Sequence, residues 1–488
     1  MAENLERYDQ GVPPEGSSGT TSNGPSLDEL VGFSKRTGFV YPSSEIYGGF
    51  SGVYDYGPRG VELVNNVKTE WWNEIVRRRK DTVGLDSSIF MHPKVWEASG
   101  HVENFSDPLA ECRVCNARVR VDHLLEAIDV PADDKMSIEE INQLFDAHRS
   151  EIHCPQCDSQ DFTDARQFNL LVASNLGNFT GDPSKDPVWL RGETCQGIYV
   201  DYRNVVDSSR VKIPFGIAQI GKAFRNEITA RQFIFRTREF EQMENQRFVH
   251  PDAEMEEYEA LREERMRYYT ERLGFTPSNL RWRVHDKLAF YANAAWDIEF
   301  LYPFGFSELE GVHARGNYDL TQHSTHSGQD LSYLNPTTGE RYIPHVIESS
   351  TGVGRTALAA LADAYTREVL PDGSERIVLK LHPKLAPVKA AVFPLVRNRA
   401  DITEKADAIY RDLAGELAAE WDDNGNTGKR YRRQDEIGTP FTVTVDHQSL
   451  DDSSVTIRDR DTMQQVRVNE SQVEQFIKDG LRKPYTKS

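Results

Sequence analysis

The chain has 488 residues, a net charge of −20 and 38% hydrophobic residues. This length exceeds one compact core, so we expect two or three domains. The acidic balance favours solubility and means that any nucleic-acid partner must be met by local basic patches. No run approaches the roughly 18 uncharged apolar residues of a membrane span, and the first residues lack the basic and apolar regions of a signal peptide. We therefore expect a cytoplasmic protein without a membrane partner.

Composition divides the chain into three parts. Residues 1–26 are polar and carry no periodic apolar signal, which is typical of a disordered tail. Residues 27–371 contain the mixed pattern of a larger domain, and residues 111–160 read as an insertion within it. From 372 to 488, strands alternate with helices, which predicts a small α/β domain with a mixed sheet.

Helical and strand periodicity locates several elements. Apolar residues at helical spacing, Val61, Val64, Val67, Trp71 and Ile75, predict a helix with one buried face. Residues 85–91 predict a strand that stops before a proline at 93, because proline cannot donate to a ladder. Residues 252–273 predict a charged helix with a solvated face, and residues 402–421 predict another helix.

Five cysteines are present, and four of them form two CxxC pairs, Cys112 with Cys115 and Cys154 with Cys157. In a reducing compartment such pairs favour a metal over disulfides. Each CxxC is a chelating turn and four thiolates complete a tetrahedron, which predicts a structural Zn²⁺ that closes the insertion. A redox pair or an empty remnant is the alternative. Cys195 is better explained as a small buried residue than as a nucleophile, because no base is identifiable beside it.

Residues 218–248 predict two strands joined by a charged loop. Strand alternation places Gly221, Ala223, Arg225 and Glu227 on one face. Two small residues leave room for a flat or phosphorylated ligand on the sheet, and a guanidinium can hold phosphate oxygens through its fork of donors. A surface hairpin with a solvated ion pair is the alternative.

Two later segments also carry polar chemistry. Glu308, Glu310 and Arg315 follow one another around a glycine, and such carboxylates suit Mg²⁺ beside phosphates. Residues 345–369 predict a strand, a glycine-containing turn and a helix that aims Arg355 at an anion, although packing explains this turn about as well. The histidines at 313, 323 and 326 lack metal-ligand spacing and favour structural roles.

The densest basic cluster of the acidic chain is Lys429, Arg430, Arg432 and Arg433, with Tyr431 between them. Phosphates require cations and unpaired bases stack on aromatic rings, so this pattern indicates an RNA-binding surface. A solvated loop is the alternative interpretation.

Three segments in order along the chain carry a family resemblance. They are the helix near residue 61 with the strand that ends before residue 93, FRNE at 224–227 with Arg236, and GVGRTAL at 352–358. They resemble motifs 1, 2 and 3 of the class II aminoacyl-tRNA synthetases. APVKAAVFPL at 386–395 and RYRRQDEIGTP at 430–440 resemble the family's anticodon-binding domain. Over nearly all of residues 27–481, the chain is similar to glycyl-tRNA synthetases of the homodimeric kind.

The resemblance implies an α+β fold with an antiparallel class II sheet flanked by helices, a zinc-clip insertion and a C-terminal anticodon-binding domain. It implies a homodimer that uses ATP and Mg²⁺ to activate glycine and transfers it to tRNA(Gly), with no DNA partner. Arg225, Glu227 and Arg355 would be catalytic. The implied ATP site is Arg225, Asn226, Glu227, Phe235, Arg236, Phe240, Leu309, Glu310, Arg315 and Arg355. The implied glycine site is Arg120, Glu193, Phe240, Gln242, Glu244, Glu348 and Ser350.

In these implied roles, Arg225 binds the α-phosphate of ATP, Glu227 holds the adenine or ribose, and Arg355 grips the γ-phosphate with help from Arg236. Glu310 coordinates Mg²⁺ and ATP. The physical chemistry agrees, because adenylyl transfer needs charge clamps and in-line positioning and no covalent nucleophile.

The sequence departs from the usual family pattern at two places. Gly192 and Cys195 flank Glu193 and Thr194 where the family most often has Pro-Glu-Thr-Ala, and Ser349 stands where it has the proline of Glu-Pro-Ser. Two other functions remain open. One is a synthetase for another small amino acid, and the other is an inactive synthetase-like protein that binds nucleic acid.

Overall fold

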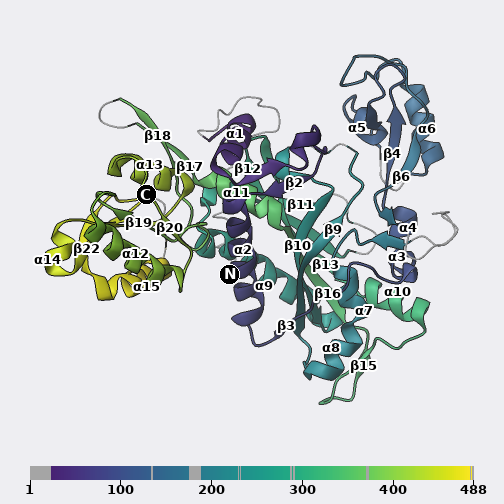
Figure 1. Cartoon of the computed structure of the whole chain (residues 1–488). Helices are drawn as coiled ribbons and strands as arrows, with labels where there is room; N and C mark the ends of the chain where they lie inside the picture. Colours follow the sequence, from purple (N-terminus) through teal and green to yellow (C-terminus); the bar gives the residue numbers. More distant parts are fainter. Residues whose placement is uncertain are drawn as a thin grey trace, which may run out of the picture.

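The computed structural model describes residues 24–132, 136–174, 188–228, 230, 232–285, 288, 292–369, 373–483 and 485. Most of the predicted tail, residues 1–23, lies outside the described residues. In Figure 1 the C-terminal part (yellow and green) lies on the left and the cysteine-containing insertion (blue) on the upper right, with a large sheet between them. Within the described residues, no helix is long and apolar enough to cross a membrane.

A seven-stranded sheet forms the centre of the molecule, in the order β11-β12-β13-β16-β10-β9-β3. All neighbours are antiparallel except β3, which runs parallel to β9. The strands are β3 (Thr82–Gly84), β9 (Phe215–Phe224), β10 (Glu239–Val249), β11 (Leu280–Val284), β12 (Ala294–Tyr302), β13 (Gly305–Gly316) and β16 (His345–Gly352).

Helices cover both faces of this sheet because both faces carry apolar side chains. We call the face that carries Gln242 and Glu244 the front and the face that carries Met243 the back. Against the back lie α2 (Pro58–Trp72), α9 (Glu254–Arg267) and α11 (Val353–Ala364), and against the front lie α7 (Cys195–Val200) and α8 (Tyr202–Ser209).

Two predictions for the N-terminal elements need correction. Val64, Val67, Trp71 and Ile75 are buried as expected, but Val61 is 41% exposed and Leu63 takes the buried place in that turn. The helix passes into a π-turn, Asn73–Arg77, after α2. The predicted strand at residues 85–91 is wrong: the strand is Thr82–Gly84, and within 85–91 only an isolated bridge from Phe90 to Leu190 is formed.

The helix predicted at residues 252–273 is α9 followed by a π-turn, Tyr268–Arg272. Its predicted solvated face is confirmed, and the helix also has a buried side. Glutamates cover the outer side, whereas Tyr258, Leu261 and Arg265 are buried against the sheet. This helix therefore supplies a buried cation to the sheet as well as a polar surface.

The insertion has its own small core. It contains β4 (Ser106–Glu111), β5 (Arg118–Arg120), α5 (Val121–Glu126), α6 (Ile138–Ala147) and β6 (Arg166–Asn169). Helix α6 begins at a reciprocal capping box between Ser137 and Glu140. Apolar residues including Leu125, Ile141 and Phe145 are buried together with Cys112 and Cys154. A hydrophobic core of this size contributes little folding free energy, and small domains of this kind commonly need a bound metal or disulfides for stability.

The C-terminal part contains a five-stranded mixed sheet in the order β20-β19-β21-β22-β23. The predicted mixed sheet of this part is confirmed. Its strands and helices are β19 (Ala390–Pro394), α12 (Ala400–Ala414), β20 (Ala419–Trp421), α13 (Thr427–Ile437), β21 (Phe441–Val445), α14 (Gln448–Asp452), β22 (Ser454–Asp459), β23 (Gln465–Asn469) and α15 (Val473–Arg482). The predicted helix at 402–421 ends at Ala414, and its last residues form the edge strand β20 beside β19.

Shorter elements connect these parts. They are α1 (Leu27–Thr37), β1 (Val40–Pro42), β2 (Tyr54–Tyr56), α3 (Pro93–Ala98), α4 (His101–Asn104), β7 (Val172–Ser174), β8 (Val188–Leu190), α10 (Tyr318–Ser327), β14 (Tyr333–Leu334), β15 (Arg341–Tyr342), β17 (Tyr365–Val369) and β18 (Glu375–Leu379). The β17–β18 hairpin leads from the central sheet to the C-terminal part.

Candidate active site

The strands β9 and β10 form the predicted hairpin, with Ala223 opposite Phe240 and Gly221 opposite Gln242. The expected open floor at Gly221 is not present. The buried guanidinium of Arg191 crosses this position, and a Cβ on Gly221 would lie 2.1 Å from its Nη2 atom. Arg191 is fixed there by bonds to the carbonyls of Ser87 (2.8 Å) and Lys222 (2.5 Å). Gly221 therefore makes room for an arginine of the protein itself.

Arg225 lies just beyond the end of β9, between two aromatic rings. Its guanidinium carbon is 5.3 Å from the ring centre of Phe105 and 5.4 Å from that of Phe240. Its Nε donates to the carbonyl of Gly192 at 3.0 Å. Cation–π contact on both sides and one hydrogen bond fix the plane of the guanidinium without neutralising its charge. The site thus contains a pre-oriented anion clamp.

The loop after Arg225 is tied to its neighbours through backbone atoms. The amide of Asn226 donates to the carbonyl of Leu170 (2.8 Å), and Arg238 Nε donates to the carbonyl of Glu227 (2.9 Å). Arg238 also donates to Ser51 and lies 5.5 Å from the Phe50 ring centre. The backbone of this loop is therefore held by Leu170 and Arg238.

Arg355, in the first turn of α11, lies against the same loop. Its guanidinium carbon is 4.4 Å from the ring centre of Phe235, and it forms an ion pair of 2.9 Å with Glu308. The helix approaches closely because residue 354 is Gly: a Cβ there would be 2.9 Å from the carbonyl oxygen of Ile234. The glycine-containing turn therefore serves a close approach to the loop that follows Arg225.

The position of Glu310 contradicts its predicted contact with Mg²⁺ and ATP. Glu310 is fully buried on the back face, where Arg265 (2.6 Å), Tyr269 (2.7 Å) and Ser349 (2.6 Å) all donate to its carboxylate. Three donors satisfy this group inside the core. The ion pair of Arg355 is formed with Glu308.

A β-bulge causes this change of face. The register between β12 and β13 shifts so that Glu310 pairs with Ile298 and Glu308 with Glu299, which leaves Leu309 as the extra residue. Glu308 and Glu310 are two apart and would share a face in a regular strand, but a bulge reverses the alternation. Leu309 and Glu310 are both buried, whereas the Glu308 side chain is 49% exposed beside Arg355. The acid at this site is Glu308.

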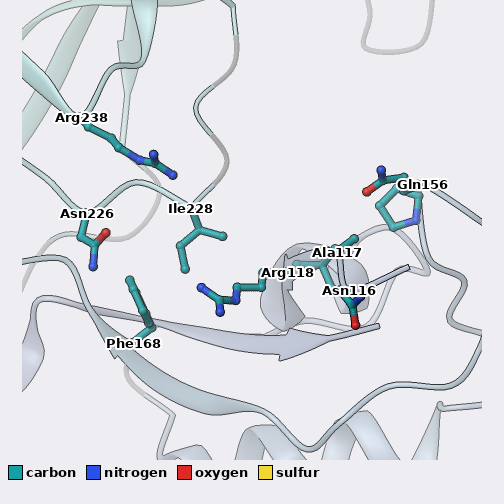
Figure 2. Close-up of a pocket in the computed structure, with 10 residues that line it drawn as sticks. Asn116, Ala117, Arg118, Gln156, Phe168, Asn226, Ile228 and Arg238 are labelled. Atoms are coloured by element: carbon teal, nitrogen blue, oxygen red, sulfur yellow. The ribbon is translucent and has the colours of Figure 1, made fainter. Parts of the chain in front are cut away.

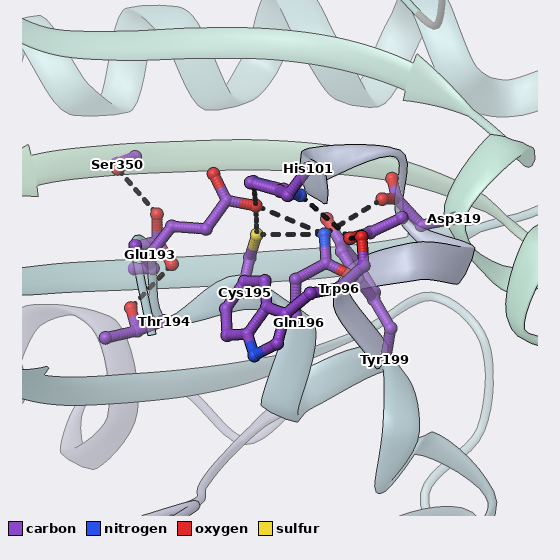
Figure 3. Close-up of polar contacts among 12 residues, drawn as sticks. Trp96, His101, Glu193, Thr194, Cys195, Gln196, Tyr199, Asp319 and Ser350 are labelled. Carbon is purple, nitrogen blue, oxygen red and sulfur yellow. Dashed lines mark hydrogen bonds and ion pairs between the residues drawn. The ribbon is translucent and has the colours of Figure 1, made fainter. Parts of the chain in front are cut away.

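Three carboxylates converge at the centre of the front face. Glu244 accepts hydrogen bonds from the hydroxyls of Thr194 (2.5 Å) and Ser350 (2.8 Å). Glu193 pairs with His101 at 3.2 Å and accepts a bond from the Cys195 thiol at 2.9 Å. Figure 3 shows Glu193 between His101 and Cys195, with Ser350 beyond it.

Glu348 is the third carboxylate and has the most cationic surroundings. It accepts a bond from Gln246 (2.8 Å) and lies 3.3 Å from both Arg315 and His313. Atoms of Cys195, Glu244 and Glu348 lie within 4.8 Å of one another, all of them buried. Together with Glu193 these groups form a compact anionic cluster, called the pocket below, which suits a small cation.

The surroundings divide the charges among these acids. Burial raises the pKa of Glu244 to about 8, and the nearby Glu348 and Glu193 add to this effect. Burial also opposes ionisation of the other two, but His101 and Arg315 hold the pKa of Glu193 well below its usual value. Arg315 and His313 hold that of Glu348 at about 2. Near pH 7 two acids are ionised and Glu244 carries a proton.

Of the remaining predicted residues, three lie together on β10 and Arg315 lies elsewhere. Phe240, Gln242 and Glu244 share the front face of β10, because alternate residues of a strand point to the same side. Arg315, predicted near ATP, instead lies beneath the pocket in bonds to Asp319 (2.9 Å) and Glu348.

The first strand after the CxxC pair ends at Arg120, whose guanidinium contacts Asp107 (2.9 Å) and Asp122 (2.5 Å). Arg236 follows the single helical turn Phe233–Phe235 at the tip of the hairpin loop and is partly buried. Cys195 is fully buried, as expected, and burial, followed by the nearby Glu193 and Glu244, raises the pKa of its thiol.

The four paired cysteines come together in the insertion. Their sulfurs lie within 4.8 Å of one another, with Cys112 and Cys157 separated by 3.6 Å and Cys115 and Cys154 also by 3.6 Å. Zn–S bonds of about 2.3 Å in a tetrahedron require S–S edges of about this length. Backbone N–H groups, chiefly that of Cys115, lower the pKa of Cys112 to about 6. The donor set and spacing fit a closed S₄ metal site.

A cavity of about 540 Å³ opens between the cysteine loops and the hairpin loop (Figure 2). Its lining comes from Asn116, Ala117, Arg118, Val119, Pro155, Gln156, Phe168, Asn226, Ile228 and Arg238. Two arginines, an aromatic ring and three side-chain amides are the groups that contact single-stranded nucleic acid. The cavity borders Asn226, next to Arg225.

The basic cluster of the C-terminal part is helix α13 and not a loop. Arg430 is buried and donates to the carbonyls of Pro394 (2.5 Å) and Asp423 (2.8 Å), so it is structural. Arg433 pairs with Asp422 at 2.7 Å. Lys429 and Arg432 are exposed and remain the candidates for phosphate contact.

Sequence reasoning missed several residues of the site, and most of them contact groups that lie far away along the chain. His101 and Gln196 contact Glu193, Thr194 bonds to Glu244, His313 contacts Glu348, and Arg191 covers the hairpin. The available signals were weak. Thr194 stands next to a predicted acid, whereas nothing in the sequence connects His101 with residue 193.

Two families match parts of the chain. The family described as "tRNA synthetase class II core domain (G, H, P, S and T)" matches residues 178–364, and the family described as "Anticodon binding domain" matches residues 389–480.

Curated relatives named "Glycine--tRNA ligase" match almost the whole chain. The relative from Chlorobaculum tepidum is 49% identical over 469 residues, which cover 92% of this chain and 99% of the relative. Those from Borreliella burgdorferi (48%; 93% and 97% covered) and Clostridium kluyveri (47%; 94% and 99% covered) are similar over the same extent. The chain belongs to the glycine–tRNA ligase family. Its fold therefore combines a class II aminoacyl-tRNA synthetase core with an anticodon-binding domain.

Proposed function

We propose that the chain activates glycine with ATP as glycyl-adenylate and transfers the glycyl group to the 3′ end of tRNA(Gly). The observation that supports this best is the buried set of three acids beside the pre-oriented Arg225. A small ammonium and an adjoining phosphate fit these two halves of the site. The family membership and both domain matches agree with this assignment.

The pocket explains a preference for an amino acid without a side chain. Glu193, Glu244 and Glu348 hold the ammonium group, and Ser350 fixes Glu244 by a hydrogen bond. Buried side chains surround this space, including Cys195 and Gln242. A pocket for glycine cannot select apolar bulk, so it discriminates by crowding the α-carbon. Alanine and serine are then rejected by contact with these walls.

Adenylate formation requires the glycine carboxylate and the α-phosphate to meet in line. Arg225 lies between Phe105 and Phe240 and neutralises charge that develops on the α-phosphate. Glu227 receives the adenine or ribose, together with Asn226. Arg355 and Arg236 hold the outer phosphates. None of these steps needs a covalent nucleophile, because the carboxylate itself attacks.

Mg²⁺ neutralises the phosphates when it is bound. We assign its protein contact to Glu308, whose partly exposed carboxylate faces Arg355. Hard carboxylate oxygen is the ligand that Mg²⁺ takes in such sites. Glu310 supports the strand from the back face through Arg265.

The cavity in Figure 2 gives the unpaired 3′ end of tRNA a route to the adenylate. Arg118 and Arg238 suit its phosphates, and Phe168 suits stacking with a base. The anticodon end would lie on the C-terminal part, on the α13 side that presents Lys429 and Arg432. The proposed domain limits are residues 27–371 and 372–488, with the insertion at 111–160.

The four cysteines would hold a structural Zn²⁺ that joins the two ends of the insertion. A second copy of the chain would cover the exposed apolar residues of the segments that resemble motif 1, Val61 (41% exposed) and Phe90 (44%). We therefore propose a cytoplasmic homodimer. Light scattering with size-exclusion chromatography should give about twice the 55.6 kDa chain mass, and a monomer at micromolar concentration would refute the dimer.

ATP–pyrophosphate exchange tests the activity directly. Exchange that depends on glycine is expected, whereas dependence on serine or alanine would identify another synthetase and no exchange would identify a binding protein. Arg225→Ala should lower exchange by at least about a hundredfold, as for removal of a transition-state charge clamp, with an unchanged melting temperature. Near-normal exchange in this variant would remove Arg225 from the mechanism.

A further inference from the structure

A row of polar side chains crosses four neighbouring strands on the front face and ends in the glycine pocket. It runs from His285, just after β11, through Asp297 of β12 and His313 of β13 to Glu348 of β16. His285 Nε2 lies 2.7 Å from Asp297 Oδ2, and His313 Nε2 lies 3.6 Å from Asp297 Oδ1. His313 Nδ1 lies 3.3 Å from Glu348 Oε1. Each member faces the next across one strand spacing.

Packing fixes the central ring of this row. Residue 311 is Gly, and a Cβ there would lie 3.0 Å from the His313 ring, so the ring lies over the strand where another side chain would stand. The rings of His285 and His313 meet edge to face, with centres 5.6 Å apart. The His313 side chain is only 22% exposed. Its orientation is therefore set before any substrate binds.

The charges along the row alternate. Burial opposes charge on His313, but Asp297 and then Glu348 raise its pKa to about 9. Burial likewise opposes ionisation of Asp297, and His285 and His313 lower its pKa to about 2. Arg315, on the same strand as His313, contacts Glu348 from the other side. Glu193 and Glu244 act on the row through Glu348.

Two histidines and an aspartate also form a ligand set that zinc accepts. The geometry favours the protonated row instead. His285 Nε2 and Asp297 Oδ2 are in direct hydrogen-bond contact at 2.7 Å, which leaves no place for an ion between them. A cationic His313 between two carboxylates also balances their charge without a metal.

We propose that His313 is a positioning residue of the glycine site, which orients the Glu348 carboxylate toward the place of the substrate ammonium. This inference rests on the proposed function. Of the three acids, Glu348 is contacted by two cationic side chains, Arg315 and His313, so its direction depends on both. Asp297 and His285 hold His313 from behind.

The test compares His313→Gln, which keeps an N–H donor without charge, and His313→Ala with the wild type. Glycine-dependent ATP–pyrophosphate exchange should show KM for glycine raised about tenfold or more, the size expected for a bond to a charged group. KM for ATP and kcat at saturating glycine should stay within about twofold. His345→Gln is the matched control, because His345 lies on the strand of Glu348 but pairs with Glu254.

The pH profile separates a charged positioning residue from a structural one. The ratio of glycine kcat/KM between wild type and His313→Gln cancels the titration of glycine and of Glu244. Because His313 is charged below its raised pKa, this ratio should be high at pH 7 to 8 and fall toward one as the pH rises through about 9.

Asp297 contacts the His313 ring on the side opposite Glu348, so Asp297→Asn should also raise KM for glycine. This variant provides a second test if the His313 variants fail to fold. An unchanged KM for glycine in a folded, active His313→Gln, or a ratio that is flat with pH, overturns the inference. Absence of glycine-dependent exchange in the wild type would instead overturn the proposed function.

Discussion

Single residues set the charge of the glycine pocket. Glu193 and Glu348 each have cationic neighbours, whereas the described contacts of Glu244 are two hydroxyls, of Thr194 and Ser350. Hydroxyl donors support a carboxylate less than a full positive charge does, and two anionic neighbours oppose its ionisation. We therefore propose Glu244 as the acid that ionises when the substrate ammonium binds.

We predict that glycine binding releases a proton from Glu244. With a pKa of about 8 in the empty pocket, Glu244 is protonated near pH 7 and must ionise to meet the ammonium. Calorimetric titration of glycine in two buffers of different ionisation enthalpy should show release of nearly one proton at pH 7 and about half at pH 8. Release that does not change with pH would contradict the assignment.

The same pKa predicts a change of stability in the substrate-free protein. The folded value of about 8 lies above the unfolded value of about 4.3. The stabilisation linked to this proton is thus complete below the unfolded value and is lost as the pH rises through about 8. Glu244→Gln should remove this loss, so its melting temperature should decline less than that of the wild type between pH 6 and 9.

At the scale of elements, one irregularity in β13 decides which of two acids lies beside Arg355. The bulge at Leu309 turns Glu308 toward Arg355 and Glu310 toward Arg265. The Arg265–Glu310 pair is fully buried, and burial is tolerable only because Tyr269 and Ser349 also donate to Glu310. A local change of register thereby separates a partly exposed acid, proposed to contact Mg²⁺, from a buried structural one.

The two glutamates should respond in opposite ways to the same substitution. Glu310→Gln leaves Arg265 without its counter-charge in the core and should lower the free energy of unfolding by about 3 to 5 kcal/mol. Glu308→Gln, at a partly exposed site, should change it by less than about 0.5 kcal/mol but raise KM for MgATP. Denaturant unfolding and exchange kinetics measure both. A stable Glu310→Gln with weakened MgATP binding would restore the sequence-based assignment.

The insertion depends on its cysteine cluster in a different way. The hydrophobic core of the insertion is small, so we expect the proposed metal to be needed for the folded conformation of the loops that carry the cysteines. Metal analysis should find about one zinc per chain, and Cys112→Ser should abolish it, while Cys195→Ala keeps it. Hydrogen exchange in Cys112→Ser should increase in residues 106–169 and stay low in the central sheet. A metal-free, fully active wild type would refute the zinc clip.

In the whole molecule, the C-terminal domain is joined to the core by side chains as well as by the chain. Arg59, at the start of α2, pairs with Glu420 of β20 across the two domains at 3.1 Å. Within the C-terminal part, Arg376 of the hairpin pairs with Asp435 of α13 at 2.8 Å, and Arg460 donates to the carbonyl of Leu381 at 2.8 Å. Leu379 and Leu381 of this same segment are buried in the hydrophobic cluster of the core, so the segment holds the anticodon-binding domain against the core.

Charge reversal on α13 should separate the two half-reactions. Lys429→Glu with Arg432→Glu should lower kcat/KM for tRNA about tenfold or more and reduce the salt slope of tRNA binding by about 2, because each lost cation removes one phosphate contact. Glycine-dependent exchange should remain unchanged. Arg430→Ala is the contrasting variant, since loss of a buried donor should destabilise the domain. If the double charge reversal lowered glycine-dependent exchange as much as Arg430→Ala does, a specific role of Lys429 and Arg432 in tRNA binding would be contradicted.

The sequence by itself determined what depends on local pattern. Strand alternation placed Gly221 and Ala223 on one face of the hairpin, and two CxxC pairs predicted a cluster that the fold does assemble. Helical spacing located α2, and the order of motifs identified the family. These features follow from spacings of a few residues, which strand and helix periods translate directly into geometry.

Tertiary structure alone decided which groups meet across long separations and where the pattern breaks. His101 reaches Glu193, Arg191 fills the space above Gly221, and the bulge at Leu309 exchanges the roles of Glu308 and Glu310. Burial then determined which acids are ionised, because the pKa of a carboxylate shifts when protein side chains replace the surrounding water. No spacing rule contains that information, since it depends on which side chains the folded sheet brings together.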